Sequence, residues 1–159
     1  MSALAALVFA TAAVATPAVP SILDVRVVDA GGRMAALRDV VGDRPTLLVL
    51  WASHCAPCRA EVPVVNRAMA RFAGLRVLGV ALETEAPRVR DAHDTWEMHY
   101  ETVWLAPDQD DLVERLLPNG IPSNAFVGHG SVKLVEHLLD DDMLAREVPP
   151  LLESAPPAR

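Results

Sequence analysis

Residues 51–63 read Trp51-Ala52-Ser53-His54-Cys55-Ala56-Pro57-Cys58-Arg59-Ala60-Glu61-Val62-Pro63, and they hold the only two cysteines of this 159-residue chain. An apolar run, residues 46–50, comes directly before them. A strand that ends in Cys-x-x-Cys and leads into a helix suits reversible dithiol–disulfide chemistry. Backbone N–H groups and the helix dipole at such a helix start also favour a thiolate. The stretch therefore predicts a redox enzyme.

Three other uses of the cysteine pair fit less well. A structural disulfide across so short a loop removes little entropy from the unfolded chain. Structural zinc normally takes four Cys or His ligands, and the chain has no second Cys-x-x-Cys and no His-x-x-x-His pair. Haem attachment requires His directly after the second cysteine, where Arg59 stands. Redox chemistry is the favoured interpretation, and we expect no metal and no cofactor beyond a redox-active Cys55–Cys58 disulfide.

The length and the net charge of the chain limit the number of domains and the kinds of partner that we expect. The chain is long enough for one domain with a proper core, plus a leader or a tail. Its formal net charge is −7, and Lys133 is its single lysine among scattered arginines. These residues make no basic stripe, so we expect no nucleic-acid partner.

Residues 1–20 predict a signal peptide or an N-terminal anchor. No charged side chain occurs before Asp24, and residues 3–15 are nearly all small or apolar, as in the core of a secretory signal. Residues 13–15, Ala-Val-Ala, form an acceptable cleavage site, although no Lys or Arg precedes the run. An Ala-rich disordered tail and an uncleaved anchor are the alternatives, and Pro17 and Pro20 disfavour a spanning helix. We expect a periplasmic or otherwise extracytoplasmic location.

Strand and helix patterns alternate along the rest of the chain. We predict strands at residues 25–28, 33–34, 46–51, 75–82, 103–105, 125–127 and 132–137, and helices at residues 37–41, 57–72, 86–99, 109–117 and 143–152. Asp108 is the expected cap of the fourth helix, and residues 140–142 open the last one. This order predicts an α/β sheet with a mixed-parallel core. The dithiol then lies at the carboxyl end of a central strand, where open α/β sheets place their sites.

Two motifs give the chain a resemblance to the TlpA/ResA-like family of exported thiol–disulfide oxidoreductases, which have the thioredoxin fold. Residues 51–63 are close to the family's W-x-x-W-C-x-P-C-x-x-E-x-P, and residues 120–123 match the G-[IV]-P-[ST] loop, whose proline peptide is cis. The resemblance covers residues 22–152. It implies a thioredoxin-like domain of mixed sheet and flanking helices, with an N-terminal strand extension and a strand–helix insertion. Residues 153–159 are the expected disordered tail.

The resemblance implies roles for four residues. Cys55 is the attacking, more exposed cysteine, and Cys58 is the buried cysteine that resolves the mixed disulfide. Pro122 holds its loop against the sulfurs, and the Ile121 backbone hydrogen-bonds an extended substrate segment. The substrates are protein thiols or disulfides, and the enzyme is expected to be a monomer.

Glu61 is the candidate for acid–base work on Cys58. It lies three positions after Cys58 on the same helix face, and the family has an acid there. Classical thioredoxins instead place a buried Asp two residues before the Trp, where this chain has Val49. An exposed carboxylate on an amphipathic helix is the alternative interpretation.

Further residues are expected to tune the site. His54 stands where the family usually has Trp; a protonated imidazole there would stabilise the Cys55 thiolate and make the disulfide more oxidising. It could equally be a surface substitution, or join Cys55 and Cys58 in a Cu(I) site. Ala56 and Pro57 are close to the Gly-Pro of reducing thioredoxins, and Trp51 is expected to pack behind the dithiol. Two acidic residues after the strand at 75–82, Glu83 and Glu85, are expected to be solvated.

Together these features predict an exported protein-disulfide reductase. By family analogy alone, it would act in cytochrome c maturation with electrons from a membrane dithiol carrier. The alternatives are an oxidase that donates its disulfide and a Cu(I)-handling module of the same fold.

Overall fold

The computed structural model describes residues 20–153 of the chain. The predicted leader (residues 1–20) and tail (residues 153–159) lie outside the described residues, apart from Pro20 and Glu153. Within the described part, no helix combines the length and the apolar character needed to span a membrane.

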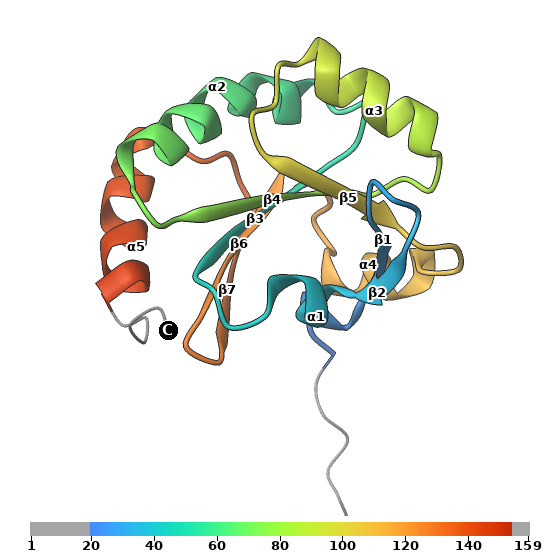
Figure 1. The fold of residues 1–159 in the computed structure, drawn as a ribbon, viewed down its shortest axis with the longest axis horizontal. Helices are drawn as coiled ribbons and strands as arrows, with labels where there is room; N and C mark the ends of the chain where they lie inside the picture. The colour runs from blue at the N-terminus through green and yellow to red at the C-terminus, as the bar shows by residue number, and fades with distance from the viewer. Residues whose placement is uncertain (1–19, 154–159) are drawn as a thin grey trace, which may run out of the picture.

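One seven-stranded sheet organises the molecule, with the strand order β2-β1-β5-β4-β3-β6-β7 (Figure 1). Its strands are β1 (Arg26–Val28), β2 (Met34–Ala36), β3 (Thr46–Trp51), β4 (Arg76–Ala81), β5 (Glu101–Leu105), β6 (Ser123–Gly128) and β7 (Ser131–Val135). The central strands β3, β4 and β5 are parallel, whereas β6 runs antiparallel to β3 and β1 antiparallel to β5. The predicted mixed α/β sheet is confirmed.

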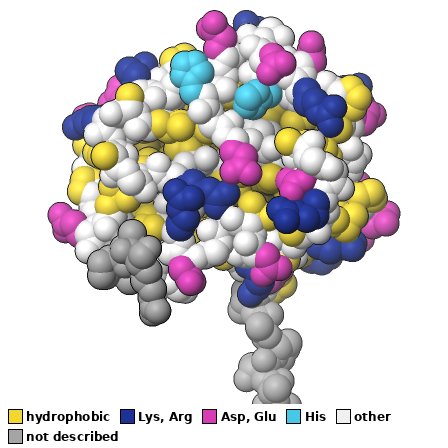
Figure 2. All heavy atoms as spheres, viewed as in Figure 1, with side chains coloured by type: hydrophobic (Ala, Val, Ile, Leu, Met, Phe, Trp, Pro, Cys, Tyr) yellow, Lys and Arg dark blue, Asp and Glu magenta, His cyan; other side chains and the backbone are white. Residues whose placement is uncertain are grey.

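Helices cover both faces of this sheet. They are α1 (Leu37–Val41), α2 (Ala56–Arg71), α3 (Ala86–Thr95), α4 (Asp110–Leu116) and α5 (Asp141–Glu153), with a 3₁₀ turn, η1 (Ile22–Asp24), before β1. Helices α2, α3 and α5 lie on one side, and the short α1 and α4 lie on the other (Figure 1). Acidic and basic side chains are interspersed with hydrophobic ones over the face drawn in Figure 2.

Strand β3 can occupy the centre of the sheet because all six of its residues tolerate burial. Five are apolar, and the hydroxyl of the sixth, Thr46, donates a hydrogen bond to the carbonyl of Arg44. Alternate side chains enter two separate cores: Leu47, Val49 and Trp51 join the cluster beneath α2 and α5, and Leu48 and Leu50 join the one on the opposite face. Burial on both faces prevents the strand from sliding by one residue, since such a shift would exchange the two sets. The start of α2 is thereby placed at a defined point on the sheet edge.

The thioredoxin arrangement is visible in the element order. Units β3-α2-β4 and β6-β7-α5 form its two halves, and α3, β5 and α4 are inserted between them. The N-terminal β1–β2 hairpin joins the sheet through pairing of β1 with β5. The predicted hairpin between β6 and β7 turns at His129 and Gly130, whose φ angles of 53° and 72° are typical of a two-residue turn.

Most element bounds lie within two residues of the predicted ones, and two differences at helix ends have an identifiable cause. Helix α3 ends at Thr95 rather than at residue 99, because Glu97 adopts a left-handed φ of 56° that no helix continues. The predicted cap of α4 by Asp108 is wrong: Gln109 is the N-cap, and Asp108 itself has a φ of 63°. The Gln109 side chain is buried instead, where its oxygen accepts a hydrogen bond from the backbone N–H of Arg26.

Candidate active site

The dithiol lies just beyond the carboxyl end of β3, as a disulfide between Cys55 and Cys58 with a Cα–Cα distance of 5.3 Å. Cys55 is the N-cap of α2, and Pro57 occupies the first turn, where a missing N–H is no loss. The Cys55 sulfur accepts a hydrogen bond from the backbone N–H of Cys58 at 3.2 Å. That N–H, together with the helix dipole, is where a Cys55 thiolate is stabilised after reduction.

The two sulfur-bearing residues differ slightly in exposure. Cys55 is 7% exposed and Cys58 is 3% exposed. Both residues are buried; Cys55, the N-cap of α2, is the slightly more exposed of the two, and Cys58 lies within the first turn of the helix. This order agrees with the assignment of Cys55 as the attacking cysteine, although the role itself stays a prediction.

Glu61 is buried, so the alternative of an exposed carboxylate is wrong. It projects from α2 on the same face as Cys58, where its Oε1 accepts hydrogen bonds from the Asn124 side chain (3.0 Å) and from the backbone N–H of Leu139. Burial raises the pKa of Glu61 to about 7, and the two donated hydrogen bonds oppose this rise. The group therefore holds or releases a proton near neutral pH, as an acid–base residue must.

Two further polar residues share this buried region and were not singled out from the sequence. Asn124 anchors Glu61, and burial together with the negative charge of Glu61 raises the pKa of Tyr100. Within the described residues, Glu61 Oε2, the Tyr100 hydroxyl and Asn124 Oδ1 have no hydrogen-bond partner. The signal in the sequence was Asn124 itself, a polar residue that, with Ser123, precedes the apolar part of strand β6.

The loop before β6 has the form that the resemblance implies. The Ile121–Pro122 peptide is cis, and Gly120 before it has a φ of 75° that suits glycine. The register of the sheet pairs Ser123 with Leu50, one residue before the end of β3. Because β3 leads directly into the dithiol turn, Ile121 and Pro122 lie beside that turn at the same edge of the sheet.

Trp51 is fully buried and packs with the half-buried Trp96, their ring centroids 5.2 Å apart. It is the last residue of β3 and lies in the same core cluster as both cysteines. Trp104 is 5% exposed and belongs to the same core cluster as Trp51.

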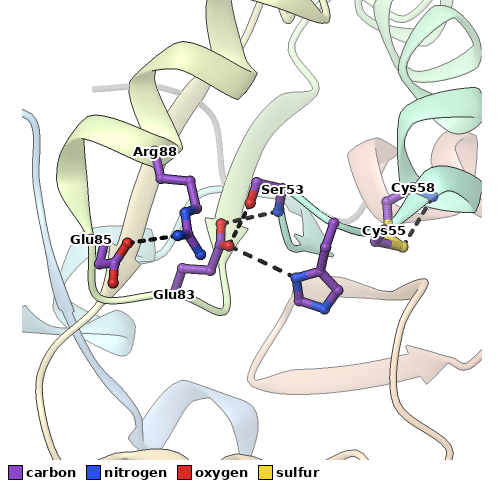
Figure 3. A network of polar contacts seen from close by, with 7 residues as sticks. Ser53, Cys55, Cys58, Glu83, Glu85 and Arg88 are labelled. Carbon is purple, nitrogen blue, oxygen red and sulfur yellow. Dashed lines mark hydrogen bonds and ion pairs between the residues drawn. A yellow bond between two sulfur atoms is a disulfide. The ribbon is translucent and has the colours of Figure 1, made fainter.

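Glu83 is not solvated, which corrects the expectation from the sequence. Its side chain is 10% exposed, and its carboxylate accepts hydrogen bonds from the backbone N–H (3.0 Å) and the hydroxyl (2.6 Å) of Ser53 (Figure 3). The same carboxylate lies 3.9 Å from Nδ1 of His54, whose side chain is 79% exposed. Glu85 conforms to the expectation, since it is exposed and pairs with Arg88 at 3.3 Å. Its contact with Ser53 could have been predicted from the sequence, because Glu83 follows β4 and β4 is the expected parallel neighbour of β3.

These features define a thiol–disulfide oxidoreductase of the thioredoxin fold: a reducible disulfide at a helix N-terminus, a cis-proline loop beside it and a buried acid on the same helix. The family follows from direct comparison. Residues 18–118 match the model of the AhpC/TSA family, and the chain belongs to that family. A comparison with curated proteins finds no match.

Solved structures support this class. DsbF of Mycobacterium tuberculosis, solved in mixed oxidised and reduced forms, is 27% identical, with a TM-score of 0.66 over 84% of this chain and 99% of that chain. A putative thiol:disulfide interchange protein DsbE from Chlorobium tepidum is 22% identical, with a TM-score of 0.62 over 84% and 94%. A secreted Mycobacterium tuberculosis disulfide oxidoreductase is 16% identical, with a TM-score of 0.60 over 77% and 92%. The last two likenesses show the fold alone. The resemblance to TlpA/ResA-like oxidoreductases is confirmed.

Proposed function

We propose that this oxidoreductase works as a reductase, passing two electrons to disulfides of exported proteins. The observation that carries the proposal is Glu61: a buried carboxyl with a pKa of about 7, on the same helix face as the resolving cysteine. A resolving thiol must lose its proton before it can attack, and a nearby base with such a pKa accepts that proton at neutral pH.

The reaction begins with the dithiol form. The Cys55 thiolate attacks one sulfur of a substrate disulfide, so that a mixed disulfide forms and the other substrate sulfur leaves as a thiolate. Glu61 then takes the proton of the Cys58 thiol. The Cys58 thiolate attacks Cys55, the mixed disulfide breaks, and the second substrate sulfur leaves. Two electrons have passed to the substrate, and the protein holds the Cys55–Cys58 disulfide.

Substrate binding is assigned to the loop beside the dithiol. Ile121 is half-buried and offers its backbone N–H and carbonyl to an extended segment, in the manner of an added strand. Pro122 carries no N–H that would compete for these bonds. His54, exposed beside Cys55, is positioned to contact the same substrate segment.

The enzyme is assigned to an extracytoplasmic compartment, with residues 1–20 as its signal or anchor and residues 22–152 as its catalytic domain. Support comes from the apolar leader and from the secreted Mycobacterium tuberculosis protein of the same fold. A membrane dithiol carrier would return the disulfide to the dithiol, and cytochrome c maturation is the proposed pathway. N-terminal sequencing of the exported protein tests the leader: a new N-terminus near residue 16 supports cleavage, and a full-length cytosolic product contradicts export.

No observation favours the Cu(I) alternative. Both cysteines of the proposed Cu(I) site are joined in the disulfide, so Cu(I) binding by the reduced protein that requires His54 is the result that would favour this alternative.

Mixed-disulfide trapping tests the assignment of the cysteines. A Cys58→Ser variant leaves the attacking thiol without its resolving partner. It should therefore accumulate a mixed disulfide with insulin whose disulfides are intact. The Cys55→Ser variant is the matched control and should trap none. Equal trapping by both variants, or trapping only by Cys55→Ser, would contradict the assigned order of attack.

A further inference from the structure

Residues 52–55 form the turn that brings Cys55 to the start of α2. One backbone hydrogen bond closes it, from the N–H of Cys55 to the carbonyl of Ala52 at 2.9 Å. Ser53 and His54 form the middle of the turn; Ser53 is half-buried and His54 is exposed. The position of the Cys55 sulfur relative to the helix therefore depends on what restrains these two residues.

Glu83 restrains the turn from the neighbouring strand. Its two carboxylate oxygens accept one hydrogen bond each from the N–H and the hydroxyl of Ser53, as Figure 3 shows. Two charge-assisted bonds between one residue and one carboxylate set the orientation of the turn as well as its distance. Because the Glu83 side chain is largely shielded from water, these bonds face little competition from solvent.

The backbone that carries Glu83 is itself held on both sides. The N–H of Leu82 donates to the carbonyl of Trp51 at 2.8 Å, and the carbonyl of Glu83 accepts from the N–H of Leu105 at 3.1 Å. These bonds extend the pairing of β4 with β3 and β5 beyond the regular strands. The Glu83 carboxylate therefore projects from a backbone that is held on both sides toward Ser53 in the middle of the turn.

Other charged groups near the turn restrain it less than the Ser53–Glu83 hydrogen bonds do. The contact from Glu83 to His54 is 3.9 Å long and involves an exposed ring, so water and salt screen it. The Glu85–Arg88 pair is exposed at both ends, and in the described part of the chain it makes no hydrogen bond to Ser53 or His54. The two bonds to Ser53 are the main restraint.

We propose that Glu83 is a positioning residue for Cys55: acting through Ser53, it holds the turn so that the attacking sulfur stays at the first turn of α2. This inference rests on the proposed function, in which Cys55 is the attacking cysteine. In the dithiol form, the restraint keeps the Cys55 thiolate within reach of the Cys58 N–H that stabilises it.

The test compares Glu83→Ala with Glu83→Gln in the full chain. Both variants lose the negative charge, but Gln keeps an oxygen for the Ser53 N–H and an N–H for the Ser53 hydroxyl. A difference between the two variants therefore reports the hydrogen bonds and not the charge. Glu85→Ala is the matched control, because it removes an exposed carboxylate two residues away and leaves the Ser53 bonds intact. Ser53→Ala is a milder version that removes only the hydroxyl bond.

Two readouts decide the outcome. Amide hydrogen exchange at Ser53 and Cys55 should be faster in Glu83→Ala than in Glu83→Gln, with Glu85→Ala unchanged from the wild type. The pH midpoint of Cys55 alkylation, measured on the reduced proteins in a Cys58→Ser background, should be higher in Glu83→Ala than in Glu83→Gln by about half a pH unit, a roughly threefold change in thiolate at acidic pH. Ser53→Ala should shift both readouts in the same direction by less.

Equal exchange rates and equal alkylation midpoints in Glu83→Ala and Glu83→Gln would overturn the proposal. Failure of the proposed function gives a different pattern. Cys55 would then be no more reactive than an ordinary thiol in the wild type and in every variant, while the exchange at Ser53 would still respond to Glu83→Ala.

Discussion

Replacement of Glu61 by Gln should remove a pH dependence of stability that the wild type carries. Burial raises the pKa of Glu61 from 4.5 to about 7, so between these values the native protein keeps a proton that the unfolded chain has released. The free energy of unfolding therefore falls as the pH rises through this window. The two pKa values correspond to a loss of about 3 kcal/mol at high pH, most of which falls between pH 5 and pH 8.

The Gln side chain is neutral at every pH, and its amide oxygen can accept the same hydrogen bonds from Asn124 and Leu139. Urea unfolding of the oxidised proteins at pH 5 and pH 8, followed by circular dichroism, measures the effect. All other titratable groups are the same in the two proteins, so the difference between the two unfolding free energies isolates Glu61. Glu85→Gln, at an exposed position, is the control and should parallel the wild type. If the wild type and Glu61→Gln lose stability in parallel from pH 5 to pH 8, the account of a buried, neutral Glu61 is wrong.

Two further substitutions test how the site is supported. Gly79→Ala should destabilise the protein by about 1–3 kcal/mol in urea unfolding, because the added Cβ would lie 2.6 Å from Thr102 Oγ1 and 3.1 Å from Trp51 Nε1; an unchanged midpoint would show that these side chains move aside freely. Asp140→Ala should cost about 1 kcal/mol, because Asp140 Oδ1 accepts a hydrogen bond from the Met143 N–H at the start of α5 (2.7 Å); full stability would refute that capping role.

The fold was predictable because its central signals are local. The apolar run of residues 46–50 predicted β3, and the cysteine pair with the periodic apolar residues after it predicted α2. The hairpin at His129 and Gly130 and the opening of α5 at Asp140 likewise follow from short-range turn and cap chemistry. Asp108 failed as a cap because the buried Gln109, which the Arg26 backbone holds, sets the start of α4; that contact joins residues 83 positions apart.

The cysteines and Pro122 could be placed from motifs, but the residues that support them could not. Glu83 reaches Ser53 only because β3 and β4 are parallel neighbours whose carboxyl ends meet at one edge of the sheet. Glu61 is buried only because Asn124 and the backbone of Leu139, from the far end of the chain, close over it. A helical pattern alone does not reveal such partners, since it gives the face of a residue but not what covers that face.

The measurement that tests the central claim most directly is the reduction potential of the Cys55–Cys58 couple, obtained by equilibration in defined thiol buffers. A reductase that hands electrons to substrate disulfides should have a value near that of thioredoxin, about −270 mV. A value near −120 mV would mark an oxidant that donates its disulfide and would contradict the account, with His54 the first residue to replace.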